Sequence, residues 1–125
     1  MIRGVRGATT VEANKEQEIL THTNKLIVDM IQQNKIQADD VASVFISATE
    51  DLDDTFPAKA LRQVEGWTYV PVMCMREIPV PNSLEKCIRV MIHFNTEQKQ
   101  NEVHHLYHNR AVQLRPDLVR REQED

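Results

Sequence analysis

The chain has 125 residues and a formal net charge of −4, a length suited to one domain with its own hydrophobic core. The negative net charge gives no general electrostatic reason to expect binding to nucleic acid or to an anionic membrane surface. The two cysteines, Cys74 and Cys87, are too far apart in sequence for a CxxC metal or redox motif. Because the sequence shows no signal peptide and no apolar stretch of membrane-spanning length, we expect a cytoplasmic protein.

The first half of the chain predicts a strand, a helix and a second strand. Residues 2–10 have the pattern of a strand, and Asn14 follows as an N-cap with Gln17 three positions later for a capping box. Apolar side chains recur at helical spacing from there to about Asn34. Residues 41–48 are a β-branched and apolar run, which is typical of a buried strand.

The second half predicts short helices and further strands. Pro57 suits the first position of a helix that ends before Gly66. The remaining predicted elements are a strand over 67–77 interrupted by Pro71, a strand over 87–95, a helix over 97–108 and a strand over 111–114. This order predicts an α+β fold, a mixed β-sheet with helices packed mainly on one face. Residues 1–118 would form this single domain, and residues 119–125 a charged, mobile tail.

The strand predicted over residues 87–95 contains an arginine within an apolar run. Period-two alternation places Arg89 on the same face as Cys87 and Met91. A buried guanidinium without an anionic partner is costly, so Arg89 requires a carboxylate from the protein or from a ligand. Glu77, at the end of the preceding apolar strand, is one such carboxylate. A structural ion pair between Glu77 and Arg89 would explain both residues without any ligand.

The sequence contains no recognisable nucleophile–base arrangement. Ser43 and Ser47 lie in a strand predicted to be buried, and no histidine belongs to a triad or zinc motif. His104, His105 and His108 fall in a polar predicted helix, where solvent exposure is the expected state. Phosphate-binding glycine motifs are also absent. Cations beside one carboxylate instead suit an anionic small ligand and a reaction that depends on positioning and electrostatics.

Five segments of the chain carry a more specific pattern. They are residues 2–10 (IRGVRGATT), 56–60 (FPAKA), 69–72 (YVPV) with Cys74 and Met75, 86–91 (KCIRVM) and 114–118 (LRPDL). Together they closely resemble the monofunctional, trimeric, barrel-type chorismate mutases. The resemblance implies a homotrimer whose sheets form a pseudo-α/β barrel, with sites in the subunit clefts and no metal or cofactor. The implied reaction is the Claisen rearrangement of chorismate to prephenate, in phenylalanine and tyrosine biosynthesis.

The resemblance also implies roles for individual residues. Arg89 would stabilise negative charge on the ether oxygen in the transition state, and Glu77 would accept a hydrogen bond from the ring hydroxyl. Arg6 and Tyr107 would bind the side-chain carboxylate. Alternation puts the Cys74 and Glu77 side chains on opposite strand faces, so Cys74 would contribute its backbone N–H or line the wall. The other implied substrate-binding residues are Phe56, Ala58, Lys59 and Arg62 from a neighbouring subunit, Met73 where threonine is common in the family, and Leu114 and Arg115 at the start of a segment that covers the pocket.

Two alternatives share some of these features. A trimeric imine deaminase has a similar fold and similar clefts, but it needs an arginine for a substrate carboxylate rather than the set Arg6, Glu77 and Arg89. A trimeric effector-binding or scaffold module would keep the cleft and lack turnover. Binding of a bicyclic transition-state mimic without conversion of chorismate would indicate such a module.

Overall fold

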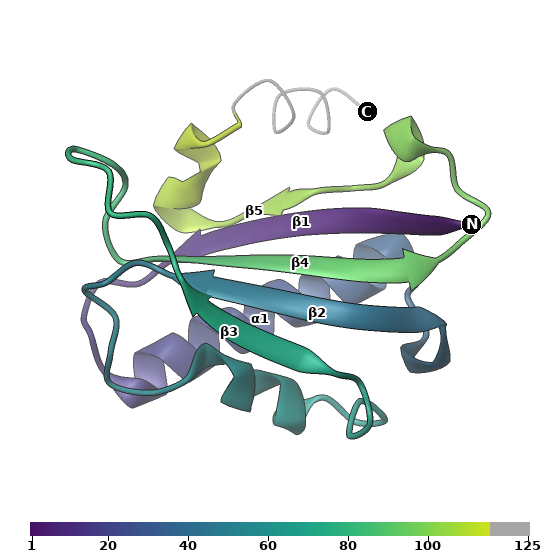
Figure 1. Cartoon of the computed structure of the whole chain (residues 1–125), viewed down its shortest axis with the longest axis horizontal. Helices are drawn as coiled ribbons and strands as arrows, with labels where there is room; N and C mark the ends of the chain where they lie inside the picture. The colour runs from purple at the N-terminus through teal and green to yellow at the C-terminus, as the bar shows by residue number, and fades with distance from the viewer. Residues whose placement is uncertain (116–125) are drawn as a thin grey trace.

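The computed structural model describes residues 1–115, which form a mixed five-stranded sheet with one long helix behind it (Figure 1). The strands are β1 (Ile2–Thr10), β2 (Val41–Ala48), β3 (Val72–Arg76), β4 (Cys87–Asn95) and β5 (Leu106–Tyr107). Their order in the sheet is β3-β2-β4-β1-β5. β4 pairs antiparallel with β1 and β2, whereas β3 and β5 pair parallel with β2 and β1. The predicted α+β fold with a mixed sheet is confirmed.

The helical part of the described chain consists of α1 (Glu16–Asn34) and four short 3-10 helices. These are η1 (Ala38–Asp40), η2 (Pro57–Gln63), η3 (Gln100–Glu102) and η4 (Asn109–Gln113). α1 packs against β1 and η2, so the longest helix covers one face of the sheet as expected (Figure 1). η4 follows β5 and packs against β1, on the side of the sheet opposite to the β3 edge.

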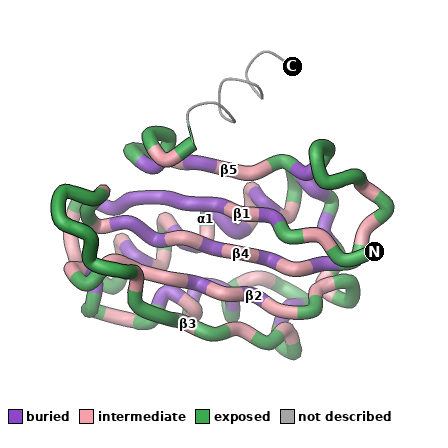
Figure 2. The backbone as a smooth tube through the Cα atoms, turned by 45° about the horizontal axis from the view of Figure 1, so that its top comes forward, coloured by how far each residue is buried: buried purple, intermediate pink, exposed green. Residues whose placement is uncertain are grey.

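The hydrophobic core lies between α1 and the sheet. Buried residues concentrate in β1, β4 and β2, whereas β3 is largely exposed (Figure 2). A Cβ added at Gly7 would lie 2.5 Å from the Met30 sulfur and 3.1 Å from Leu26 Cδ1, so even a methyl group there would require the Met30 side chain to shift. The main core residues are Val5, Ile19, Leu26, Ile27, Met30, Val44, Ile46, Ile88, Val90, Ile92 and Phe94.

Three predicted boundaries in the first part of the chain are wrong in detail. The N-cap of α1 is Lys15, without a side-chain cap, because Asn14 binds the acidic loop instead: its amide nitrogen donates to Asp53 at 2.7 Å. The segment starting at Pro57 is a 3-10 helix that ends at Gln63. The strand predicted over 67–77 is restricted to Val72–Arg76, since the preceding residues form turns around a buried Trp67.

The predictions for residues 97–114 are wrong in type. Residues 97–108 form η3 and the short strand β5 rather than one helix, and residues 111–114 belong to η4 and its end rather than to a strand. The reason is tertiary: the outer edge of β1 offers unpaired peptide groups, and pairing with them outweighs local helix propensity. Residues 119–125, predicted to be a charged tail, lie outside the described residues.

Candidate active site

The sheet face turned away from α1, here called the open face, carries most of the predicted site residues. Because Gly7 faces α1, alternation turns Arg6 and Ala8 toward the open face. The strand registers place Arg89 directly opposite both Ala8 and Ser47. One row across the open face is therefore Tyr107, Ala8, Arg89, Ser47 and Met75, and the next contains Arg6, Met91, Phe45 and Met73.

Glu77 reaches this row from the end of β3. Its backbone N–H donates to Ala48 O at 2.9 Å, which continues the parallel pairing of β2 and β3 by one residue. Ser47 Oγ donates to Glu77 Oε2 at 3.1 Å, and the N–H of Ile78 donates to Oε1 at 3.1 Å. Each carboxylate oxygen thus receives one hydrogen bond, which restricts the orientation of the group.

Arg89 lies within ion-pair distance of Glu77, but its Nε–H does not donate a hydrogen bond to the carboxylate. Its Nε is 3.4 Å from Glu77 Oε2, yet this buried atom makes no hydrogen bond within residues 1–115. The distance qualifies as an ion pair, and the missing hydrogen bond shows that the N–H does not point at the carboxylate. The two side chains keep 35% and 25% of their surface exposed, so the guanidinium remains accessible to an anionic ligand.

Arg6 lines a cavity of about 310 Å³ between β1, β4 and the 100–115 segment, here called the Arg6 cavity. Its Nε is likewise buried and without a hydrogen-bond partner within the described part of the chain. The lining residues are Gly4, Arg6, Met91, His93, Gln100, His105, Tyr107 and Arg115. None of these carries a carboxylate, so the cavity is a cationic region in a protein of net charge −4.

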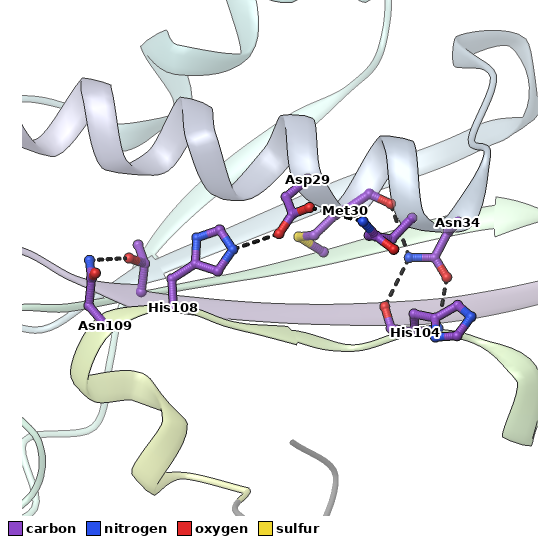
Figure 3. A network of polar contacts seen from close by, with 8 residues as sticks. Asp29, Met30, Asn34, His104, His108 and Asn109 are labelled. Atoms are coloured by element: carbon purple, nitrogen blue, oxygen red, sulfur yellow. Dashed lines mark hydrogen bonds and ion pairs between the residues drawn. The ribbon is translucent and has the colours of Figure 1, made fainter. Parts of the chain in front are cut away.

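The segment that carries Tyr107 is held in place mainly by side chains (Figure 3). Asn34, at the end of α1, receives the N–H of His104 at 2.8 Å and donates to its carbonyl oxygen at 2.9 Å. His108 Nε2 lies 2.8 Å from Asp29 Oδ2, a second link to α1. Asn109 donates to Thr10 O at 2.9 Å. These contacts compensate for a β5 of only two residues.

Tyr107 and Leu114 meet in a small apolar cluster above β1. The cluster contains Ala8, Tyr107 and Ala111, with Leu84 and Leu114 packed against it. Tyr107 is 8% exposed and also lines the Arg6 cavity, as does the exposed Arg115. The structure thus brings Tyr107 and Arg115 to the same cavity as Arg6, and Tyr107 lies on a strand rather than on the predicted helix.

A second cavity, of about 770 Å³, lies near β3 and η2 and is here called the Phe56 cavity. Phe56 is 68% exposed there, and Lys59 Nζ forms an exposed ion pair with Glu16 at 3.5 Å. Ala58 is half-buried against the core, and Arg62 is exposed. The Phe56 cavity is lined by Ala48, Thr49, Glu50, Leu52, Asp53, Asp54, Thr55, Phe56, Pro57, Lys59, Cys74, Met75 and Arg76.

Cys74 and Met73 lie on different faces of β3. Cys74 pairs with the buried Ile46 and packs against the core, which confirms that its side chain faces away from Glu77. Burial raises the pKa of the Cys74 thiol, and a hydrogen bond with the backbone of Ala58 opposes this only partly. Met73, by contrast, is 62% exposed on the open face.

The predicted residues form two groups within one chain. Arg6, Tyr107 and Arg115 lie by β1 and β5, and the Arg89–Glu77 pair lies centrally. The other group, Phe56, Ala58, Lys59 and Arg62, lies in or just before η2, which contacts β2 and β3 beyond β4 in the sheet order. A single chain therefore does not bring the η2 residues to Arg6.

Sequence reasoning missed three residues that act on this region. Ser47 lies in a strand predicted to be buried. Val44 and Ile46 on this strand face the core, so alternation places Ser47 on the opposite, open face. His105 was expected to be exposed on a helix, but its Nδ1 accepts the backbone N–H of Arg6 at 3.0 Å. No local signal identifies Asn34, whose partner is 70 residues away.

Within residues 1–115, no group of three or more His, Cys, Asp or Glu side chains is arranged to hold a metal ion. None of the helices in this part of the chain combines the length and the apolar character needed to cross a membrane.

Comparisons with known proteins agree on one family. The family model described as "Chorismate mutase type I" matches residues 2–118. The chorismate mutase AroH of Bacillus subtilis (strain 168) is 50% identical over 118 residues, covering 94% of this chain and 93% of the relative. The AroH protein of Thermus thermophilus is 45% identical over 119 residues, covering 94% and 97%. A solved chorismate mutase from Clostridium thermocellum superimposes with a TM-score of 0.84 at 48% identity, covering 87% of this chain and 96% of that one.

Proposed function

The chain belongs to the type I chorismate mutase family, and we propose that Arg89 and Glu77 are the catalytic residues of its chorismate-to-prephenate rearrangement. In this reaction an ether C–O bond breaks while a C–C bond forms, without proton transfer or a covalent intermediate. Catalysis therefore consists of holding a reactive conformer and stabilising the charge that separates as the bond breaks. The observation that carries the proposal is the buried Nε of Arg89, which has no hydrogen-bond partner within residues 1–115.

Arg89 supplies a positive charge where negative charge develops. As the ether bond lengthens, electron density moves to the departing oxygen, and a fixed guanidinium beside it stabilises the transition state more than the ground state. The ring fragment becomes correspondingly positive. Glu77 accepts a hydrogen bond from the ring hydroxyl and places its negative charge near that fragment. The hydrogen bonds from Ser47 and Ile78 to the carboxylate support this role because they hold it at the edge of the open face.

The two carboxylates of chorismate require cations on both sides of this pair. Arg6 and Tyr107 bind the side-chain carboxylate in the Arg6 cavity, with Leu114 and Arg115 at its margin. The second buried Nε without a hydrogen bond in residues 1–115, that of Arg6, supports this assignment. The absence of any carboxylate in the lining of the cavity supports it as well, since an acidic neighbour would compete with the substrate.

The ring carboxylate is bound by a neighbouring subunit in this proposal. Phe56, Ala58, Lys59 and Arg62 cannot reach the Arg6 cavity of their own chain, as the sheet order separates them. A homotrimer with one site in each cleft joins the two halves, with Met73 and Cys74 lining the wall. Met73 and Met75 are exposed on the open face, and sheets that pack into a barrel-like core would bury them. Two unpaired cysteines, Cys74 and Cys87, suit a cytoplasmic location.

The test follows the loss of the ultraviolet absorbance of chorismate with purified protein and no added metal or cofactor. We expect fast, saturable conversion to prephenate by the wild-type protein and almost none by the Arg89→Ala variant. Near-normal turnover by that variant would overturn the assignment of Arg89. A folded wild-type protein that binds a bicyclic transition-state mimic without converting chorismate would instead indicate a binding module.

A further inference from the structure

The imidazole of His105 has a defined tautomer. Its Nδ1 lies 3.0 Å from the backbone nitrogen of Arg6 and accepts that N–H. A peptide nitrogen can only donate, so Nδ1 carries no proton, and the proton of the neutral ring is on Nε2. Nε2–H is therefore a donor, and the ring's only hydrogen bond within residues 1–115 is the one at Nδ1.

The surroundings of His105 keep this ring neutral. Burial lowers the pKa of the imidazole, and the positive charges of Arg6 and Arg115 lower it further. The hydrogen bond to the Arg6 backbone opposes these effects, and His104 adds to them. The cavity that His105 shares with Arg6 and Arg115 has no acidic lining residue to favour the protonated ring.

The position of His105 relates it directly to Arg6. β5 pairs in parallel with β1, with Leu106 opposite Gly7 and Tyr107 opposite Ala8. Since Gly7 faces α1, Leu106 does too, and His105 and Tyr107 on either side of it face the open side. His105 and Tyr107 consequently both line the cavity that holds Arg6.

We propose that His105 is a further substrate-binding residue, whose Nε2–H donates a hydrogen bond to the carboxylate that Arg6 and Tyr107 bind. This inference rests on the proposed function of the same cavity and adds a third donor to it. Because the imidazole is neutral, it contributes a directional hydrogen bond to the carboxylate and no additional positive charge. Because its other nitrogen is attached to the backbone of Arg6, the same side chain also fixes the position of β5 relative to Arg6.

Two substitutions separate these two contributions of His105. In His105→Asn, Oδ1 is as many bonds from Cα as Nδ1 of histidine, so it can still accept the Arg6 N–H, whereas the distal donor is lost. In His105→Gln, the amide Nε2 is as many bonds from Cα as the histidine Nε2, so the donor is kept and the acceptor is displaced. Asn therefore removes the proposed substrate contact, and Gln removes the contact with the backbone.

The experiment compares KM, kcat and urea unfolding of the wild type and both variants. We expect His105→Asn to unfold like the wild type and to raise KM about tenfold, the loss for one hydrogen bond to a charged group. His105→Gln should have a KM closer to that of the wild type and should be less stable to urea than the wild type. A wild-type KM for the folded Asn variant would overturn the proposal and leave His105 with a structural role only.

A measurement on the wild-type protein decides the matter if either variant fails to fold. The imidazole 15N and Nε2–H signals of His105 are followed by NMR during titration with a bicyclic dicarboxylate transition-state mimic. A shift of the Nε2 signal at saturation supports the proposal, and an unchanged signal with the mimic bound overturns it. Since this titration needs no turnover, a protein that binds the mimic but does not convert chorismate would refute the proposed reaction and still test His105.

Discussion

Ser47 and Glu77 are joined by a hydrogen bond of 3.1 Å from the serine hydroxyl to Oε2 of the carboxylate. Ser47 lies directly opposite Arg89 in the ladder between β2 and β4. Ser47 therefore pairs with Arg89 across the sheet and also binds Glu77, the carboxylate next to that arginine. The second carboxylate oxygen is held by the N–H of Ile78. Glu77 is therefore positioned by two donors from two different segments of the chain.

Replacing Ser47 by alanine tests whether this hydroxyl positions Glu77. We expect Ser47→Ala to lower kcat several-fold, equivalent to about 1 kcal/mol for one hydrogen bond, with little change in KM. Ser43→Ala is the matched control, because Ser43 lies on the same strand face but contacts His93 at 3.2 Å instead. Steady-state kinetics of both variants provides the measurement. Equal losses in the two variants would contradict a specific role for Ser47.

Replacing Arg89 by lysine tests the shape of the catalytic cation. Arg89→Lys keeps the positive charge but cannot reproduce the planar, multiply donating guanidinium. We expect kcat/KM to fall by an amount corresponding to about 3 kcal/mol or more, by analogy with the loss of a donor to a developing oxyanion. Circular dichroism should show an unchanged fold, since the side chain is partly exposed. Turnover close to that of the wild type would be incompatible with the proposed role.

Mixed oligomers test whether each site is shared between subunits. Arg89→Ala and Lys59→Ala chains, inactive or impaired alone, are unfolded together and refolded as a mixture. If Arg89 and Lys59 of one site come from different chains, about a quarter of the sites in an equimolar mixture have both residues intact. Activity should therefore reappear. The control mixes Arg89→Ala with Glu77→Ala, whose residues lie 3.4 Å apart in one chain, and should regain nothing. No recovery in the first mixture would argue for sites within single chains.

Replacing Asn34 by alanine tests the link between α1 and the segment that carries Tyr107. The substitution removes both bonds to the backbone of His104 and a bond of 3.0 Å to Met30 O, and Asn34 itself is buried. We expect a loss of about 1–3 kcal/mol of unfolding free energy and a higher KM, because Tyr107 is less well held. Urea unfolding and kinetics of Asn34→Ala are compared with Gln33→Ala, an exposed position on the same helix. A larger effect at Gln33 would contradict this role.

The lowered pKa of His105 predicts a pH dependence of stability. Its folded-state pKa lies below the ordinary value of 6.5, so between these two values the unfolded chain binds more protons than the folded one. The contribution to stability is therefore fully present above about pH 6.5 and is lost as the pH falls toward the folded pKa. Urea midpoints measured from about pH 8 to about pH 5 should decrease more in the wild type than in His105→Asn. A wild-type midpoint that rises on acidification relative to the variant would contradict the sign.

Much of the sheet could be predicted from local patterns in the sequence. β1, β2 and β4 have their predicted bounds. A strand with one buried face produces an alternating pattern of side chains, and this pattern can be recognised directly in the sequence. The same alternation correctly separated Cys74 from Glu77 onto opposite faces of the chain. The contact between Glu77 and Arg89, which the sequence predicts as a possible structural ion pair, is also present.

The region after β4 depended on the tertiary structure. Residues 97–108 are compatible with a helix when taken alone, yet Asn34 binds the backbone N–H and C=O of His104, and β1 pairs with Leu106 and Tyr107. These partners lie about 70 to 100 residues earlier in the chain, so no local window of sequence contains them. The sequence by itself determined which residues face the same side of each strand, since side-chain alternation is local. Only the tertiary structure decided that His105 and Tyr107 lie beside Arg6. This placement requires the free edge of β1 and the C-terminal end of α1 to contact the same segment, residues 104–107.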